Sequence, residues 1–404
     1  MRDYFRKLEE KVRKYSRKYK NCPQKAALKL AFWNLACVFR SHSSISVLPK
    51  PEKITTSPAL SEEEKARQHI AVRLCGGIGD QLIGCNYLYH LAKKFPKLRI
   101  DVYARKEIHG RFIDAKKWNG TLLEPCKNIP EHYDAIIQLD RYPHVISLNG
   151  RVLPQLDGFS SYVSELENFR QKYSRFFDYG TRLDGMTAVY SIIMGKKRIQ
   201  QADINNILGI GEEFSYELPY AKTDVCQVYG LMPGKFITIH RGCDANHTAN
   251  SIKLWPQEYY DTLVAGIKAL YPDITVVQLG VNEERCPAMK NIDRNLVGKT
   301  SLDDVLVILK NSVLHIDSEG GFVHMRHALK AGKSIVLFGA TSKEFYGYSE
   351  NINLRSSLCP MSCEHVMEKW DTYCHISRSE SPACMRSLLP EDVLSAVVKE
   401  LRHV

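Results

Sequence analysis

The sequence predicts an α/β protein with two doubly wound units, each a largely parallel sheet covered by helices. Two observations lead to this prediction. Short apolar runs alternate with amphipathic stretches of helical length, and this alternation is typical of parallel sheets with helical crossovers. It begins near residue 70 and restarts near residue 236. With 404 residues, the chain has room for two such domains and additional segments.

The first unit begins with an apolar strand at Ile70–Leu74. A glycine-rich turn follows, and then an amphipathic helix over Gln81–Phe95. Further strands are expected at Ile100–Ala104, Asp134–Leu139 and Val145–Leu148, and residues 160–210 have a helical pattern.

The second unit begins with the apolar run Phe236–His240. Its expected elements follow in order: helix Gln257–Leu270, strand Ile274–Leu279, helix Leu302–Lys310, strand Val313–Asp317, helix Val323–Ala331 and strand Ser334–Phe338. Two doubly wound units in tandem bind ligands in the cleft between them, at the carboxyl ends of the strands. The predicted boundaries are an extension and linker at 1–66, two Rossmann-like domains at 67–228 and 229–346, and a cysteine-rich segment with a C-terminal helix at 347–404.

The net charge of +11 is concentrated at the start of the chain. Residues 1–20 contain nine Lys or Arg against three Asp or Glu. This distribution argues against a nucleic-acid-binding core and indicates a basic N-terminal extension. Two interpretations remain open: a solvated, partly helical tail, or a peripheral contact with anionic lipid or an acidic partner. Residues 41–66 are rich in Ser, Pro and charge, as expected of a linker.

The sequence has no apolar signal segment in its first 20 residues. The apolar stretch Ala26–Phe39 has 14 residues and contains Lys29, so it is too short to span a bilayer. Twelve cysteines without a signal segment indicate a reducing compartment. We therefore expect a cytoplasmic protein, with the basic extension as a candidate for peripheral attachment to the inner membrane.

The glycine turn Cys75–Gly84 connects a strand to a helix, so its backbone N–H groups could bind an anion. It does not fit the dinucleotide fingerprint, because Leu82 stands where the third glycine is required. An NAD-dependent oxidoreductase is therefore disfavoured. Asp80 in this turn has two interpretations: a helix cap, or a general base acting on an acceptor hydroxyl.

Three loops at predicted strand ends carry candidate ligand-binding residues. The loop 241–256 contains Thr248, Ser251 and Lys253, which together suggest a phosphate cradle with Lys253 as its cation. Glu283 follows the next strand and could accept hydrogen bonds from a base or a ribose. The alternative for Lys253 is an ordinary solvent-exposed side chain without a ligand.

The third loop is a strand-to-helix turn. It places Glu319, Gly320, Gly321 and His324 together. The glycines would let a ligand approach the backbone, and the helix N-terminus would face phosphates. A capping role for Glu319 and a structural role for His324 are the alternatives.

The order of these motifs resembles glycosyltransferase family 9, the heptosyltransferases, over about residues 70–400. The motifs are Gly79-Asp80, Lys253-Leu254-Trp255-Pro256, Gly280 to Glu283, Val297 to Leu302, the acidic and glycine-rich turn ending at His324, and Leu337 to Thr341. The chain departs from the family at one point, since Glu319 stands where the family usually has Asp.

The resemblance implies a fold of the GT-B type, with an acceptor domain followed by a nucleotide-sugar domain. It also implies site roles. Asp80 would be the catalytic base, Lys253 and Thr248 would contact phosphates, and Glu283 would contact the nucleoside. The turn from Glu319 to His324 would hold the ribose and diphosphate.

The implied activity is inverting transfer of a sugar, with ADP-heptose as the expected donor. The acceptor would be a hydroxyl of a bacterial surface glycan or of another glycoconjugate, including a protein. The chain contains no Asp-x-Asp pair, so no catalytic metal is expected. A non-catalytic nucleotide-sugar-binding or scaffold protein of the same fold is the alternative.

Four cysteines, Cys359, Cys363, Cys374 and Cys384, lie within 26 residues of otherwise polar sequence. Four thiolates can bind Zn²⁺ or iron tetrahedrally, and a site filled by protein ligands is structural. Some proteins of the similar family carry a four-cysteine iron site, which supports this hypothesis. Buried, unliganded thiols are the alternative.

Overall fold

The computed structural model describes residues 69–402, except 110–111, 113–119, 127, 131, 150–157, 174–193, 204, 221–223, 243–251, 360–361 and 365–369. The basic extension and linker, Thr248 and Ser251 lie outside the described residues. The chain divides into two compact units. The described part of the first unit is 69–75, 87–196 and 200–210, and that of the second unit is 76–86, 197–199 and 211–402.

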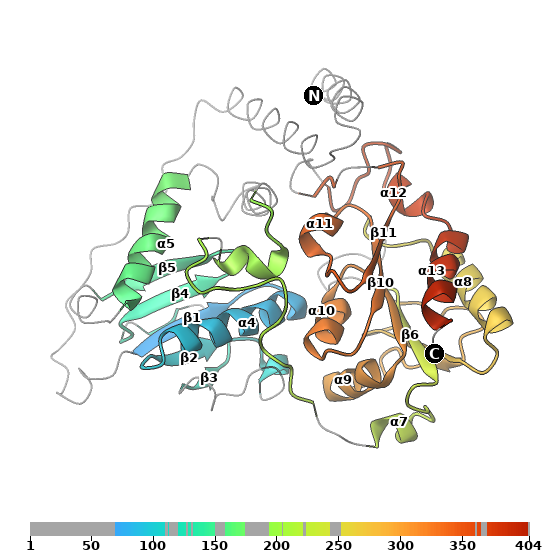
Figure 1. The fold of residues 1–404 in the computed structure, drawn as a ribbon, viewed down its shortest axis with the longest axis horizontal. Coiled ribbons are helices and arrows are strands. Elements are labelled where there is room, and N and C mark those ends of the chain that lie inside the picture. The colour runs from blue at the N-terminus through green and yellow to red at the C-terminus, as the bar shows by residue number, and fades with distance from the viewer. Residues whose placement is uncertain are drawn as a thin grey trace. The chain divides into compact units, whose positions relative to one another are not determined.

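The first unit is built on a five-stranded sheet with the order β3-β2-β1-β4-β5 (Figure 1). The strands are β1 (His69–Leu74), β2 (Arg99–Tyr103), β3 (Leu122–Leu123), β4 (Ala135–Leu139) and β5 (Pro143–Leu148). β5 is antiparallel to β4, and the other neighbours are parallel. Three residues join β4 to β5, and so short a connection can form a hairpin but not a crossover. The expected parallel pattern therefore ends at this edge strand.

The second unit is built on a six-stranded sheet with the order β11-β10-β9-β6-β7-β8, and all its neighbouring strands are parallel. The strands are β6 (Phe236–His240), β7 (Thr275–Leu279), β8 (Arg294–Asn295), β9 (Leu314–Ser318), β10 (Ser334–Phe338) and β11 (Ile352–Arg355). Successive strands are added on one side of β6 and then on the other. The order thus reverses between β6 and β9, and such a switch point is where doubly wound sheets bind ligands.

The α-helices of the described chain are α4 (Ile78–Lys94), α5 (Phe159–Tyr173), α7 (Val225–Val228), α8 (Gln257–Leu270), α9 (Leu302–Asn311), α10 (Gly321–Ala328), α11 (Lys343–Tyr346), α12 (Ala383–Arg386) and α13 (Pro390–Leu401), with 3-10 turns at Lys106–Ile108 and Arg198–Asp203. None of the helices in the described part of the chain is long and apolar enough to cross a membrane.

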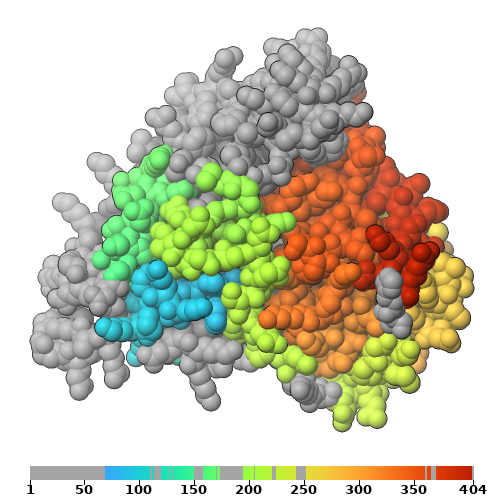
Figure 2. Space-filling view, in the orientation of Figure 1, coloured from blue at the N-terminus to red at the C-terminus, as the bar shows by residue number. Residues whose placement is uncertain are grey.

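Helices α8 and α13 lie side by side against the second sheet (Figures 1 and 2). Their apolar faces meet in a core that includes fully buried Trp255, Tyr260, Val393 and Val397. The indole N–H of Trp255 donates a 2.8 Å hydrogen bond to the carbonyl of Leu388, so the buried indole is satisfied. The Trp of the Lys-x-Trp-Pro motif therefore anchors the C-terminal helix to the start of α8.

The prediction of an α/β fold with two mainly parallel sheets is confirmed. β6, α8 and β10 have the predicted bounds, and the other individually predicted strands and helices agree within a few residues. In the stretch 160–210, predicted to be helical, α5 covers Phe159–Tyr173 and a 3-10 turn covers Arg198–Asp203, while 174–193 and 204 lie outside the described residues. Three strands were missed. β3 and β8 have two residues each, and β11 has four, too few for a periodic pattern to be recognised.

Candidate functional site

The candidate site lies at the carboxyl ends of β6 and β9, on either side of the switch point. β6 ends at His240, and β9 ends at Ser318. Glu319 follows β9 directly, and α10 begins at Gly321 with His324 in its first turn. The short strand-to-helix connection is therefore what brings the predicted acidic group and histidine together.

Three predicted residues, Lys253, Glu319 and His324, form one cluster. Nζ of Lys253 lies 3.4 Å from Oε2 of Glu319, and Nε2 of His324 lies 3.8 Å from Oε1 of the same carboxylate. The side chains are 18%, 10% and 7% exposed, respectively. The Glu319 carboxylate thus stands between the two other groups in a nearly buried environment, where charge interactions are strong.

Electrostatic partners keep Lys253 and Glu319 ionised despite their burial. Burial lowers the pKa of Lys253. The charges of Glu319, Glu364 and Asp80 raise it by more than burial lowers it, so the net pKa is above its ordinary value. Burial raises the pKa of Glu319, but Lys253 and His324 lower it to a net value below the ordinary one. At neutral pH Lys253 is therefore a cation whose charge is partly balanced by Glu319.

Two helix N-termini meet beside this cluster. A Cβ atom on Gly79 would lie 2.8 Å from Cδ2 of His324 and 3.3 Å from Cα of Gly321, so the start of α4 packs directly on the start of α10. The N-terminus of a helix carries unpaired N–H groups and a positive partial charge. Two such ends beside Lys253 make this part of the second unit suited to an anion.

The glycines of the α10 turn differ in their roles. Gly321 contacts the start of α4, since its added Cβ would lie 3.7 Å from the backbone N of Gly79. Gly320 is extended, and the atom nearest to its added Cβ is 3.8 Å away. Gly320 is also the N-cap of α10, without a side-chain capping bond. Glu319 precedes the cap, so the alternative that it caps this helix is wrong.

Asp80 makes the contact expected of a helix-capping residue, and its role as a general base stays a prediction. It lies in the first turn of α4, and its Oδ2 accepts a 3.2 Å hydrogen bond from the N–H of Gly77, as a capping residue does. Its Oδ1 accepts a 2.7 Å hydrogen bond from Nη2 of Arg198. The Asp80 side chain is 44% exposed, whereas that of Arg198 is 5% exposed. The carboxylate is therefore held in a fixed orientation and still reaches solvent.

Arg198 was not predicted as a site residue. It belongs to the run Lys196-Lys197-Arg198, and three successive cations usually indicate a solvated segment. In the structure Lys196 and Arg198 are buried. No local pattern connects Arg198 to a carboxylate 118 residues away.

Two further unpredicted contacts, which share Asp317, lie at the switch point. Nδ1 of His240 is 2.9 Å from Oδ1 of Asp317, and Nε2 of His315 is 3.4 Å from Oδ2 of the same residue. Burial raises the pKa of Asp317, but His240 and His315 lower it to a net value below the ordinary one. Asp317 is 1% exposed, so it is buried at the end of β9 and is not accessible to a ligand. The acidic residue that faces Lys253 is Glu319.

Glu283 lies in the loop after β7, and its side chain is exposed. β7 neighbours β6 in the sheet, so Glu283 follows a strand beside the switch point. Thr248 and Ser251 belong to the loop after β6, whose residues 243–251 are outside the described part of the chain. Their predicted phosphate contacts stay predictions.

The four cysteines of the C-terminal segment influence one another. The neighbouring thiol of Cys359, burial, and the charges of Cys363 and Cys374 raise the pKa of Cys384. Burial and the charge of Cys359 raise the pKa of Cys363 to about 12. Within the described residues, the sulfurs do not form a set of three within 4.8 Å of one another; the one such group of potential ligand atoms belongs to Glu213, His327 and Glu350.

The comparisons with known proteins agree with the resemblance seen in the sequence. The model of glycosyltransferase family 9 (heptosyltransferase) matches residues 243–375. This segment contains Lys253, Glu283, Glu319 and His324, so the resemblance is confirmed over the part of the chain that forms most of the site. No curated protein matches the sequence.

Solved structures share the fold at low identity. A family 9 glycosyltransferase from Veillonella parvula has a TM-score of 0.50 and 15% identity, over 84% of this chain and 99% of that chain. The iron-containing dodecameric glycosyltransferase TibC from enterotoxigenic E. coli has a TM-score of 0.54 and 12% identity, over 83% and 76%. The heptosyltransferase TibC in complex with ADP-D-beta-D-heptose has a TM-score of 0.54 and 13% identity, over 84% and 77%. The fold is thus that of these glycosyltransferases.

Proposed function

We propose that this family 9-like glycosyltransferase transfers heptose from a nucleoside diphosphate heptose to a hydroxyl group of a bacterial surface glycan or glycoconjugate. The observation that carries the proposal is the cluster of Lys253, Glu319 and His324 beside the N-termini of α4 and α10. ADP-heptose is the proposed donor, because the heptosyltransferase TibC shares the fold and has been solved with that compound.

In this proposal the diphosphate of the donor binds to Lys253 and to the two helix N-termini. A diphosphate needs several positive partners, and Lys253 supplies a full charge while each helix end supplies roughly +0.5 of a charge. His324 donates a hydrogen bond to a phosphate oxygen. Thr248 and Ser251 belong to the same phosphate cradle.

The negative charge of Glu319 is balanced by Lys253, so Glu319 does not simply repel the anionic donor. Its carboxylate, 3.4 Å from Nζ of Lys253, keeps the ammonium oriented and accepts hydrogen bonds from the ribose hydroxyls. Glu283, exposed after β7, contacts the nucleoside. The longer side chain of Glu319, compared with the Asp usual in the family, sets how far the ribose lies from the strand end.

The transfer step is an inverting displacement with Asp80 as general base. Asp80 takes the proton of the acceptor hydroxyl, whose oxygen attacks the anomeric carbon from the face opposite the diphosphate. The bond between that carbon and the phosphate oxygen breaks, and its electron pair leaves with the nucleoside diphosphate. Lys253 and the helix-end N–H groups stabilise the developing charge. These groups perform the role that a carboxylate-held Mg²⁺ has elsewhere, so transfer should persist in EDTA.

The proposal is tested with the purified full chain. Native mass spectrometry against ADP-, GDP- and UDP-sugars identifies the donor, and release of nucleoside diphosphate measures turnover. Asp80→Asn should reduce turnover by at least 100-fold with little change in donor binding, whereas Lys253→Ala should weaken both. Asp224→Asn and Lys290→Ala, at sites outside the cluster, serve as controls. Nucleotide-sugar binding without any turnover across the panel would favour a non-catalytic protein.

We also propose a structural metal, Zn²⁺ or iron, on Cys359, Cys363, Cys374 and Cys384. The support is chemical: neighbouring thiols that oppose each other's ionisation are stabilised as thiolates by a divalent cation. TibC, which shares the fold, is described as iron-containing. Elemental analysis should find about one metal ion per chain, lost in Cys384→Ser but retained in Cys126→Ser. A metal-free wild type that is fully stable would refute the site.

A further inference from the structure

Tyr348, between α11 and β11, makes a contact with the candidate donor site that sequence analysis did not anticipate. Its hydroxyl lies 2.6 Å from Nδ1 of His324. The two rings are perpendicular, with centroids 5.6 Å apart, so the hydroxyl meets His324 edge-on. Tyr348 is 5% exposed. The hydrogen bond is therefore shielded from water, and its loss would leave a buried polar group unsatisfied.

The two nitrogens of His324 face partners of different kinds. Nε2 lies 3.8 Å from Oε1 of Glu319, and a carboxylate can only accept a hydrogen bond. Nδ1 faces a hydroxyl, which can either donate or accept. Burial, followed by the charge of Glu350, raises the pKa of Tyr348 well above its ordinary value, so the phenol keeps its proton at neutral pH. The carboxylate favours the tautomer with hydrogen on Nε2, and the phenol can then donate its proton to the lone pair on Nδ1.

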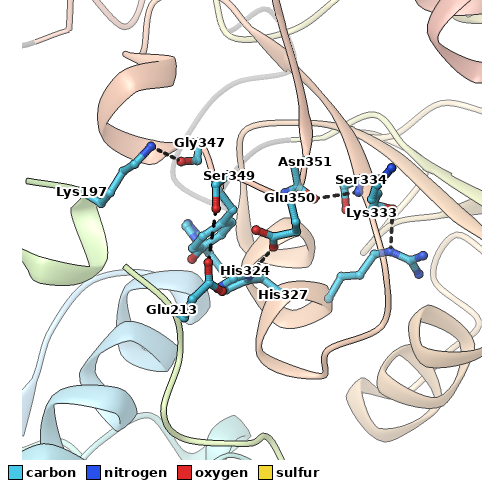
Figure 3. A network of polar contacts seen from close by, with 12 residues as sticks. Lys197, Glu213, His324, His327, Lys333, Ser334, Gly347, Ser349, Glu350 and Asn351 are labelled. Atoms are coloured by element: carbon cyan, nitrogen blue, oxygen red, sulfur yellow. Dashed lines mark hydrogen bonds and ion pairs between the residues drawn. The ribbon is translucent and has the colours of Figure 1, made fainter. Parts of the chain in front are cut away.

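The Tyr348 ring is itself held in place by the neighbouring ring of His327. Its ring stacks on His327 at a centroid distance of 3.6 Å and an angle of 12°. Nδ1 of His327 contacts Oε1 of Glu350, and Nε2 lies 3.4 Å from Oε2 of Glu213. Figure 3 shows His327 beside these two carboxylates, with His324 one turn earlier on the same helix. The contact of Nδ1 with Glu350 orients the His327 ring, and the stacked Tyr348 ring lies parallel to it.

We propose that Tyr348 is a positioning residue for the donor site. It donates a hydrogen bond to Nδ1 of His324 and so holds Nε2–H toward Glu319 and the donor diphosphate. His327, hydrogen-bonded to Glu350 and stacked on the Tyr348 ring, keeps that ring in place. The role of His324 toward a diphosphate rests on the proposed function, whereas its tautomer does not.

The tautomer is measured by long-range ¹H–¹⁵N NMR of the full chain labelled at histidine. The His324→Gln variant identifies the His324 signals. The wild type should show His324 protonated at Nε2 and free at Nδ1, and Tyr348→Phe should produce a mixture of tautomers. A wild-type His324 protonated at Nδ1, alone or together with Nε2, would overturn the proposal. The wild-type spectrum tests the predicted tautomer of His324 even if Tyr348→Phe folds poorly.

Calorimetric titration with ADP gives a readout that does not need turnover. Tyr348→Phe should weaken ADP binding about 5–10-fold, the effect of one lost hydrogen bond in a buried site. Tyr87→Phe is the matched control, since Tyr87 is also fully buried and hydrogen-bonds another tyrosine, Tyr162, in the first unit. It should bind ADP like the wild type.

The two measurements separate the two proposals. The expected tautomer without nucleotide binding would overturn the proposed function and leave the positioning of His324 intact. ADP binding that is identical in wild type and Tyr348→Phe, or weakened equally in Tyr87→Phe, would overturn the role of Tyr348 while the proposed function stands.

Discussion

Nη2 of Arg198 lies 2.7 Å from Oδ1 of Asp80. The second oxygen of Asp80 accepts the N–H of Gly77, so each oxygen of the proposed base has a partner within the second unit. A carboxylate held in this way is pre-oriented, which is the condition for efficient proton transfer at a fixed distance. We therefore expect the nearly buried guanidinium to position the proposed base.

Arg198→Gln should lower kcat at least tenfold while changing the affinity for ADP less than about threefold, because it releases Asp80 without touching the phosphate-binding groups. Turnover and calorimetric titration measure the two effects. Arg198→Lys should be intermediate, since a lysine keeps the charge but lacks the planar fork. Arg294→Gln, on the exposed strand β8, is the control. An unchanged kcat in Arg198→Gln would show that Asp80 needs no such partner.

Gly79→Ala should damage donor binding through the contact of α4 with α10. The added Cβ would lie 2.8 Å from Cδ2 of His324 and 3.3 Å from Cα of Gly321. Both are too close for a carbon contact, so His324 or the helix end must move. We expect the Kd for ADP to rise about tenfold. Gly211→Ala is a matched control, because nothing lies within 4 Å of its added Cβ. Equal binding by the two variants would contradict the close packing.

Asp317→Asn tests the buried carboxylate that lies between His240 and His315. The net pKa of Asp317 is below its ordinary value, so its ionisation stabilises the fold above the unfolded pKa of about 3.9. That contribution is lost as the pH falls through the folded pKa. Asp317→Asn should therefore cost about 3 kcal/mol of unfolding free energy at pH 7, and the difference should shrink below pH 4.

Urea unfolding at several pH values measures this difference. Glu107→Gln is the comparison, since Glu107 pairs with Arg105 on the surface at 3.3 Å and such pairs contribute about 0.5 kcal/mol. A destabilisation by Asp317→Asn that stays the same from pH 7 down to values well below pH 4 would show that packing, and not charge, is responsible.

Arg326→Lys tests a buried cation that is held by neutral acceptors. The Arg326 guanidinium donates to the carbonyls of Leu309, Ser312 and Lys333 and to the hydroxyl of Ser312. Burial lowers its pKa to about 10. Lysine cannot reproduce the fork, so at least two buried acceptors lose their partner. We expect a loss of about 3 kcal/mol in unfolding free energy, seen as a lower Tm; a shift within that of Glu107→Gln would refute this role.

Much of the fold could be predicted because strands and helices of doubly wound units carry local signals. Apolar runs bounded by polar turns located β6, α8 and β10 at their observed bounds. Edge strands could not be predicted in the same way. β3 and β8 form two bridges each to one neighbour, so burial imposes little pattern on their residues. The antiparallel direction of β5 depends on a three-residue hairpin, which the apolar pattern alone does not distinguish from a parallel continuation.

The candidate site also has features that could be predicted from local sequence and features that could not. The sequence by itself determined that Lys253, Glu319 and His324 follow strands or open helices, because the position of a residue relative to its own element is local information. Only the tertiary structure decided their partners. Arg198 reaches Asp80 across 118 residues, and Tyr348 reaches His324 across 24. Such contacts depend on strand order and helix packing, and these are set by the burial of apolar surface over the whole chain. The residues that they bring together therefore carry no periodic pattern in the sequence.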